Sequence, residues 1–405
     1  MRRTVLLLSV ILPAALAAQN ECGTGRYSDP TLFDSLTVTL GVPFGANTGV
    51  GGTLQTLYMD VYEPAGDTLS ERPVVLVAFG GSFVAGSRAD VAELCEAFAH
   101  RGYVAVAPDY RVGFFFPNAT TTQQAVMRGA HDMRACVRHL RKTVAEDGNP
   151  YGIDVDRIIV GGVSAGAIAA IHATYLDQPA ELPAVLVPDS AALGGIEGNS
   201  GTPNYSSEVL ACYSYSGAIG DTSWIVPGDQ PLVSVHETGD AIVPCYTQEV
   251  SVFGIPTGLI ASGSAHIHQH AEAIGLEHCF LLYPGTGHVG YFNSDPQGSE
   301  AIVVDFLANV VCGLPAACGL QAASVPETTT AAPLVVFPNP STGRITVSLA
   351  RPTTLDLFDA TGRLVLSTTE PAGDRTLDLD VRPGTYLLRD RELPGRFTRI
   401  LVHER

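Results

Sequence analysis

Apolar runs alternate with helical stretches over most of this sequence, and this alternation constrains the fold more than any other feature. Several runs, such as 73–79 and 103–110, are continuous hydrophobic blocks, as expected of parallel strands that are covered on both faces. Helical candidates at 88–102 and 123–147 lie between them. The sequence therefore predicts an α/β fold, a mostly parallel sheet with helices on both faces. The expected strands are 35–41, 56–64, 73–79, 103–110, 157–163, 209–219, 231–237 and 279–285.

The pattern changes near the C-terminal end. Residues 319–333 are rich in Thr, Ala and Pro and have no apolar period, which predicts a linker. Six short, evenly spaced apolar runs bounded by turn residues then lie within 334–405, which predicts a small antiparallel β-sandwich. The expected organisation is an α/β domain at 19–318, the linker, and this all-β domain.

Residues 1–18 have the pattern of a cleaved signal peptide. Arg2 and Arg3 precede an apolar run over 5–16, and Ala15-Leu16-Ala17 supplies the small-x-small cleavage pattern. The run is too short for a retained membrane span, which needs roughly 20 apolar residues. We therefore expect an exported protein without a retained transmembrane segment.

The charge balance excludes two kinds of partner. The chain has 41 acidic and 23 basic residues and a formal net charge of -18. Binding to nucleic acid or to an anionic lipid surface needs clustered Lys and Arg, so neither partner is expected.

All eight cysteines follow the expected signal peptide, and an even number in an exported chain favours disulfides. Cys312 and Cys318 are close enough in sequence for a local bond, whereas the other pairings, and whether some cysteines stay free, are left open. No pair has the C-x-x-C spacing of a structural metal site, so no metal is expected.

The motif that carries chemistry is Gly162-Val163-Ser164-Ala165-Gly166. It lies directly after the expected strand 157–163 and before a helix of small residues at 165–176. A nucleophilic serine on a tight strand-to-helix turn has a strained backbone, so its neighbours must be small. The helix N-terminus behind it offers N–H groups to a developing oxyanion. This placement favours a nucleophile over a bystander serine in a Gly-rich turn.

A serine nucleophile needs a base and an orienting carboxylate, which in this type of fold follow in the order Ser, acid, His. Asp240 comes just after the expected strand 231–237, and His288 lies between glycines after the last expected strand. Each side chain would emerge at the carboxyl end of its strand, where open α/β sheets bind ligands. The sequence therefore predicts a triad of Ser164, Asp240 and His288.

The oxyanion hole is expected to use backbone N–H groups. One donor would be the residue after the nucleophile, Ala165, and the others would be Gly81 and Ser82 in the glycine-rich loop after the third expected strand.

Other polar residues are weaker candidates. Asp189 and Asp221 lack the strand-loop setting of the expected acid and suit solvated loops. His266, His268 and His270 alternate, but they match no metalloenzyme motif and suit a helix start. Trp224 suits the core or a pocket wall, and the aromatic run 114–116 fits either a core or an exposed wall of the acyl pocket.

The motifs in order resemble those of the α/β-hydrolase superfamily, close to its carboxylesterase and feruloyl-esterase-like branch. The resemblance covers roughly residues 55–310 and implies an ester substrate. Relatives usually carry His-Gly-Gly-Gly where this chain has Phe79-Gly80-Gly81-Ser82, so a hydrogen bond that braces the loop is lost. The matching stretches are 60–67, 77–87, 108–113, 161–166, 238–244 and 286–288.

The C-terminal segment is similar to the sorting domain of type IX secretion cargo. The similarity lies in FPNPSTG at 337–343 and in the stretches 357–365, 377–380 and 383–389. It implies a Bacteroidota-type bacterium, the type IX machinery as a partner, and a secreted or cell-surface location. A carbohydrate-binding sandwich would need an exposed aromatic platform, for which this segment has few aromatic residues.

These features together predict a secreted serine esterase that works through an acyl-enzyme and needs no cofactor. Two alternatives remain: a serine peptidase of the same fold, and a non-catalytic binding protein on a hydrolase scaffold. The acyl group stays open among acetyl, feruloyl and longer aliphatic groups and polyesters.

Overall fold

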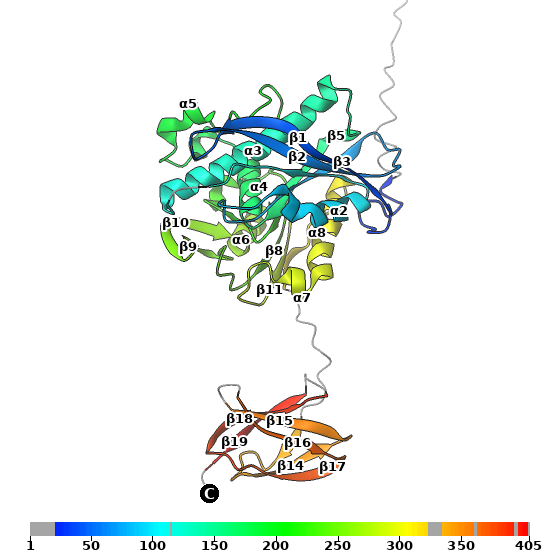
Figure 1. Ribbon diagram of the computed structural model, residues 1–405, viewed down its shortest axis with the longest axis vertical. Coiled ribbons are helices and arrows are strands. Elements are labelled where there is room, and N and C mark those ends of the chain that lie inside the picture. Colours follow the sequence, from blue (N-terminus) through cyan, green and yellow to red (C-terminus); the bar gives the residue numbers. More distant parts are fainter. Residues whose placement is uncertain (1–20, 114–115, 323–333, 360–362, 393–395, 404–405) are drawn as a thin grey trace, which may run out of the picture. The chain divides into compact units, whose positions relative to one another are not determined.

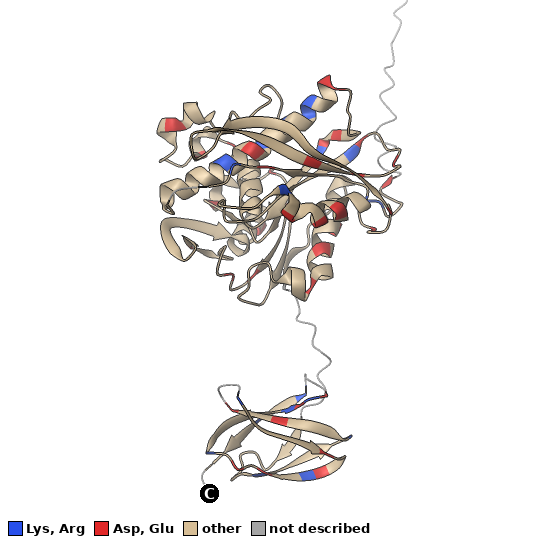
Figure 2. Cartoon of the chain, viewed as in Figure 1, with Lys and Arg blue, Asp and Glu red and all other residues tan. Residues whose placement is uncertain are grey.

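The computed structural model describes residues 21–113, 116–322, 334–359, 363–392 and 396–403 (Figure 1). The chain divides into two compact units, Met1–Ala323 and Ser324–Arg405. Acidic and basic residues are interspersed along the elements of both units (Figure 2). Among the described residues, no helix is long and apolar enough to cross a membrane. The expected signal peptide lies outside the described residues.

A nine-stranded sheet forms the centre of the first unit, in the order β1-β2-β4-β3-β5-β6-β8-β11-β12. Strands β1, β2 and β4 pair antiparallel, and the pairs from β4 through β3 to β12 are parallel. The strands are β1 (Leu36–Thr48), β2 (Leu54–Pro64), β3 (Arg72–Ala78), β4 (Val104–Pro108), β5 (Ile153–Val163), β6 (Ala211–Tyr215), β8 (Leu232–Glu237), β11 (His278–Tyr283) and β12 (Gly319–Ala322).

Helices cover both faces of this sheet, as the continuous apolar strands require. Every residue of β3, β4, β6 and β8 is buried. Successive side chains of a strand point to opposite faces of the sheet. On β6, Tyr213 packs on Phe98 of helix α2, and its neighbour Cys212 lies against Thr174 of helix α4, so these two helices cover opposite faces. The helices are α2 (Ala92–His100), α3 (Ala119–Glu146), α4 (Ala165–Tyr175), α5 (Ser190–Leu193), α6 (Ser264–Ile274), α7 (Tyr291–Ser294) and α8 (Pro296–Val311), with short 3-10 turns η1 (Arg88–Val91), η2 (Pro179–Glu181), η3 (Val187–Asp189) and η4 (Thr222–Trp224).

Several strand assignments differ from the sequence-based expectation. The expected run 209–219 is divided into β6 and the short β7 (Ala218–Ile219), because Ser216 between them has a φ of 56° and turns the chain. Strand β7 pairs with β10 (Ile255–Gly263), which pairs with β9 (Thr247–Val252), in a separate antiparallel sheet. The β9–β10 hairpin was not expected.

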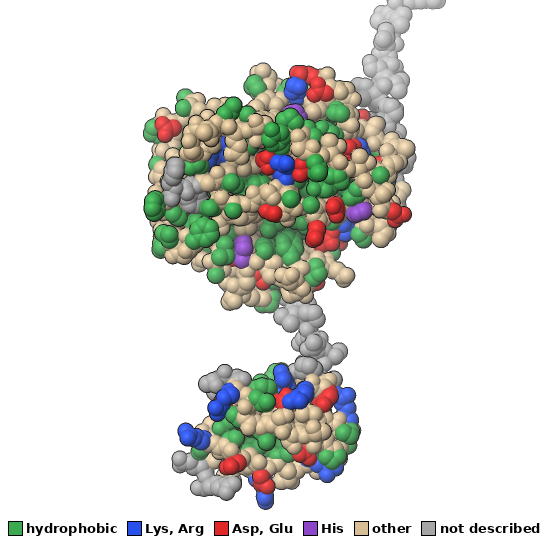
Figure 3. Space-filling view, in the orientation of Figure 1, with side chains coloured by type: hydrophobic (Ala, Val, Ile, Leu, Met, Phe, Trp, Pro, Cys, Tyr) green, Lys and Arg blue, Asp and Glu red, His purple; other side chains and the backbone are tan. Residues whose placement is uncertain are grey.

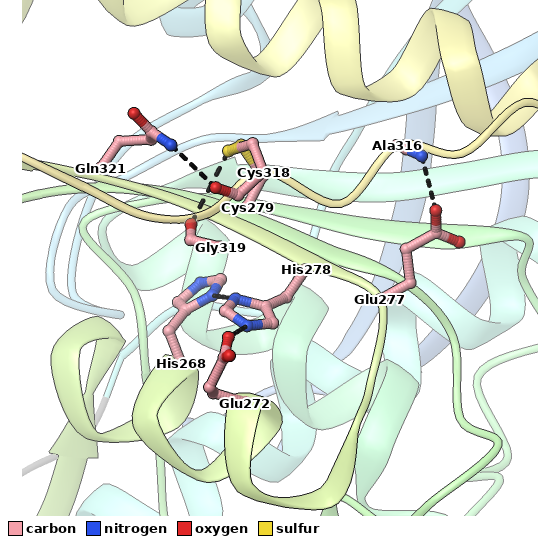
Figure 4. The surroundings of a disulfide bond; sticks show 9 residues. All are labelled: His268, Glu272, Glu277, His278, Cys279, Ala316, Cys318, Gly319 and Gln321. Atoms are coloured by element: carbon pink, nitrogen blue, oxygen red, sulfur yellow. Dashed lines mark hydrogen bonds and ion pairs between the residues drawn. A yellow bond between two sulfur atoms is a disulfide. The ribbon is translucent and has the colours of Figure 1, made fainter.

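The local disulfide between Cys312 and Cys318, which their closeness in sequence suggested, is not formed, so this prediction is wrong. Cys312 pairs with Cys22, at a Cα–Cα distance of 5.9 Å, and Cys318 pairs with Cys279, at 4.7 Å. The Cys318 N–H donates to the His278 carbonyl, which holds Cys318 beside β11, where it is bonded to Cys279 (Figure 4). The residues that follow form β12, inside the range expected to be linker.

Half of the cysteines are not in disulfides. Cys95, Cys136, Cys212 and Cys245 are free and buried, so the expectation that export would favour disulfides applies to four of the eight. Buried cysteines of this kind pack as small hydrophobic side chains.

The second unit is a β-sandwich of two antiparallel sheets. Their orders are β13-β14-β17 and β16-β15-β18-β19, and both contribute to one apolar core that includes Val347 and Leu357. The strands are β13 (Val335–Phe337), β14 (Arg344–Leu349), β15 (Thr353–Asp359), β16 (Leu364–Glu370), β17 (Gly373–Asp378), β18 (Gly384–Asp390) and β19 (Phe397–Val402). All six expected strands are present, and β13 is an addition.

Candidate active site

Ser164 lies on a tight turn between β5 and α4. Its φ of 55° is in the left-handed region, which costs a non-glycine residue about 1–3 kcal/mol. The flanking glycines make this turn possible, since a Cβ atom at Gly162 or Gly166 would lie 2.4 or 2.2 Å from the Ala78 carbonyl oxygen. The strained turn holds the serine side chain at the carboxyl end of the sheet.

The three residues expected to form a triad lie within hydrogen-bond distance of one another. Ser164 Oγ is 2.8 Å from His288 Nε2, and His288 Nδ1 is 2.7 Å from Asp240 Oδ2. Because a carboxylate only accepts, Nδ1 carries the proton, and Nε2 is then free to accept the serine hydroxyl proton. Ser164 and Asp240 are buried, whereas the His288 side chain is 21% exposed.

Asp240 is held as an ionised carboxylate. Burial alone would raise the pKa of this carboxyl group. Hydrogen bonds from His236, His288 and the backbone N–H of Ile242 outweigh the burial and hold the pKa well below its usual value. The group therefore stays charged at neutral pH and can stabilise a protonated His288.

A second histidine, His236, also contacts Asp240, although it was not among the expected site residues. It lies on β8, fully buried, with Nε2 3.3 Å from Asp240 Oδ2 and 3.1 Å from the Val243 carbonyl oxygen. Its Nδ1 is 2.8 Å from the Ser264 hydroxyl. Since the carbonyl can only accept, Nε2 carries the proton, which also points toward the carboxylate. The available signal was a histidine four residues before the expected acid.

The glycine-rich loop after β3 lies against Ser164. A Cβ atom at Gly80 would be 3.3 Å from the Ser164 Cβ, so the loop approaches the serine closely. Ser82 and Ala165 line a cavity together with Ser164, and no described residue accepts a hydrogen bond from either backbone N–H. Gly81 does not line this cavity, and its φ of 118° forms the turn.

Tyr110 braces this loop. Its hydroxyl donates to the Phe79 carbonyl at 2.8 Å, and the two rings stack with centroids 4.2 Å apart. The loop that begins with Phe79 is therefore braced by a tyrosine hydroxyl.

The cavity beside Ser164 has a volume of about 370 Å³ and a mostly apolar lining. Trp224 forms part of its wall, and its ring meets that of His172 edge-on at 5.7 Å. Burial lowers the pKa of His172 to about 4, so the imidazole is neutral. The apolar side chains of the lining include Val126, Met127, Ile168, Leu176, Ile219, Val243, Val250 and Leu259.

The weaker candidates lie elsewhere or have other contacts. Asp221 lines the cavity beside Ser164, but its carboxylate accepts a hydrogen bond from the Ser223 N–H, and among the described residues no contact joins it to His288. Asp189 borders a second cavity of about 510 Å³. Phe116 is 76% exposed, while the other two residues of the aromatic run lie outside the described residues.

The alternating histidines lie on α6, as expected. His268 Nδ1 is 3.0 Å from His278 Nδ1, and His278 Nε2 is 2.7 Å from a Glu272 oxygen (Figure 4). Over the part of the chain that the structure describes, no group of three or more His, Cys, Asp or Glu could hold a metal ion.

Comparison with known proteins gives two family matches. Residues 59–199 match the BD-FAE family, and residues 335–399 match the secretion system C-terminal sorting domain. No curated protein matches the chain.

Solved structures similar to the chain include several of esterase 2 from Thermogutta terrifontis. The form phosphoramylated by tabun has 23% identity and a TM-score of 0.47, and the match covers 66% of this chain and 95% of that one. The butyrate-bound form has 22% identity and a TM-score of 0.46, with coverage of 66% and 95%. The BD-FAE match indicates an esterase domain of α/β-hydrolase type within the α/β sheet unit, and the sorting-domain match indicates type IX secretion, to the cell surface or the medium, in Bacteroidota.

Proposed function

We propose that this protein is a secreted serine hydrolase of carboxylic esters, with Ser164 as its nucleophile. In this proposal residues 19–318 together with β12 are the catalytic domain, the remainder of the expected linker 319–333 connects it to the next domain, and 334–405 are the sorting domain that engages the type IX machinery. The observation that carries the proposal is the chain of two hydrogen bonds from Ser164 through His288 to Asp240, at the end of an apolar cavity.

Acylation begins when Ser164 Oγ attacks the ester carbonyl carbon and His288 Nε2 takes the hydroxyl proton. Asp240 stays ionised and stabilises the imidazolium. His288 then gives this proton to the alkoxide oxygen as the bond to the alcohol breaks, and the acyl group remains on the serine. The imidazole is partly exposed, which lets the alcohol leave into solvent.

Backbone N–H groups stabilise the negative charge of each tetrahedral intermediate. Ser82 and Ala165 provide these donors, and Gly81 shapes the loop that presents Ser82. Losing one such donor costs about 3 kcal/mol of transition-state stabilisation. Water then attacks the acyl group with His288 again as the base, which releases the acid and restores the serine hydroxyl.

The test is hydrolysis of nitrophenyl esters by the full chain, together with covalent labelling by a fluorophosphonate. The Ser164→Ala variant is expected to lose both activities and keep the fold. The matched control is Ser223→Ala, an exposed serine that does not line the cavity, which is expected to keep both. Labelling at another residue, or full activity of Ser164→Ala, would refute the assignment. Preferred cleavage of peptide anilides would favour a peptidase.

A further inference from the structure

The β9–β10 hairpin forms one wall of the cavity beside Ser164. Residues 250–254, Leu259 and Ala261 of this hairpin line it. Ile260 lies between two lining residues but points away, since successive side chains of a strand face opposite sides, and it is 54% exposed. Strand β10 therefore turns Leu259 and Ala261 toward the cavity and Ile260 toward solvent.

Phe253 occupies the tip of this hairpin, where its backbone has a left-handed conformation that a bulky side chain disfavours. Val252 pairs with Ile255, so Phe253 and Gly254 form a two-residue turn, with φ of 52° and 76°. Two positive φ values favour Asn-Gly in such turns, and a bulky residue there costs about 1–2 kcal/mol. The Phe253 side chain is nevertheless 76% exposed, so packing does not offset this cost.

The cavity is placed to hold the acyl side of an ester. Ser164 and the oxyanion donors Ser82 and Ala165 line it, but among the described residues neither His288 nor Asp240 does. The leaving alcohol has to be beside His288 to receive its proton, which leaves this cavity to the acyl group. The lining offers such a group mostly apolar side chains.

Exposed apolar side chains continue from the cavity to the surface. Ile242 lines the cavity and is 49% exposed, and Phe253 lines it from the hairpin tip. Hydrophobic side chains are visible on the surface where β9 and β10 lie (Figure 3). We call Ile242 and Phe253 together the apolar lip of the cavity.

We propose that the apolar lip binds the distal part of an aliphatic acyl chain that starts at Ser164, so that the substrates are esters of medium-length or longer aliphatic acids. This inference rests on the proposed esterase function. Each additional methylene that the cavity and the lip remove from water favours the longer ester, which raises kcat/KM from acetate through butyrate to octanoate. Packing in the fold gives no reason for a strained, exposed Phe253 at this position, whereas a role in binding the acyl chain would.

The experiment compares kcat/KM for nitrophenyl acetate, butyrate and octanoate in the full chain. Phe253→Asn places a residue that suits the turn, so the hairpin is expected to remain at least as stable. The ratio of octanoate to acetate is expected to fall roughly tenfold in this variant. The matched control Ile260→Asn changes an exposed apolar residue of the same hairpin outside the cavity, and it is expected to leave both rates unchanged.

The outcomes separate the two proposals. An unchanged ratio in Phe253→Asn, an equal fall in Ile260→Asn, or cleavage of methyl ferulate in preference to octanoate would overturn the lip while leaving a serine esterase in place. Absence of Ser164-dependent hydrolysis of every ester would instead refute the esterase function itself.

Discussion

Acidification is expected to destabilise the α/β sheet unit through His172. This side chain is buried, with Nδ1 2.8 Å from the Ile168 carbonyl oxygen and Nε2 3.3 Å from the Gly220 nitrogen. Nδ1 donates to the Ile168 carbonyl and Nε2 accepts from the Gly220 N–H. A second proton on the ring would sit on Nε2 and face the Gly220 N–H, which breaks that hydrogen bond. The folded protein therefore keeps His172 neutral to low pH.

The magnitude follows from the pKa. Burial lowers the pKa of His172 from its usual 6.5 to about 4. Between pH 6.5 and 5 the unfolded chain binds a proton at this residue that the folded chain does not, so the free energy of unfolding falls as the pH falls. At about 1.4 kcal/mol for each pH unit, the loss down to pH 5 is about 2 kcal/mol.

Urea unfolding at pH 7 and pH 5 measures this loss. Trp224 is the single tryptophan of the chain and lies beside His172, so its fluorescence follows the α/β sheet unit alone. His172→Gln cannot titrate, and its oxygen can still accept from Gly220. The variant is expected to lose about 2 kcal/mol less than the wild type between the two pH values.

His131 provides a second variant for the same comparison. Burial lowers its pKa to about 3, so His131→Gln is expected to reduce the acid destabilisation in the same way. Equal losses in the wild type and in both variants would refute the reasoning, whatever the variants do to stability at pH 7.

Three further predictions follow from the site and the disulfides. Cys22→Ser opens the bond to Cys312, which spans 290 residues, and is expected to lower the free energy of unfolding by about 5 kcal/mol in urea; an equal stability with and without the bond would contradict this. Gly81→Ala would place a Cβ atom 2.2 Å from the Ala85 carbonyl oxygen, so we expect kcat to fall about a hundredfold as the oxyanion loop shifts, and unchanged kinetics would show that the loop is not required. His236→Asn removes a hydrogen bond to the carboxylate, and we expect kcat to fall ten- to a hundredfold with KM unchanged; a change in KM alone would argue against a positioning role.

The candidate triad could be predicted from sequence because each member has a local signal. Ser164 has small neighbours on both sides, and Asp240 and His288 each lie in the loop that follows an apolar strand. The parallel sheet then brings the three carboxyl ends of these strands together, so the approximate arrangement depends only on strand order.

The features that the sequence did not predict depend on contacts between distant segments. Cys22 and Cys312 are 290 residues apart, and only the packing of α8 brings them together. His236 continues an apolar strand, where a histidine has no pattern of its own. The β9–β10 hairpin has a mixed exposure pattern and contains Pro256 and Gly258, so it lacks the regular alternation of a strand.

The two disulfides also determine how mechanical load would pass through the α/β sheet unit. A pull on the chain beyond residue 322 would first peel β12 from the edge of the sheet, because no covalent bond holds that strand. At Cys318 the load would pass through the disulfide to Cys279 in β11, a strand that stays paired with β8. Helix α8 lies between these two cysteines in the chain, and it would therefore be bypassed by the force and stay folded while the sorting domain is pulled.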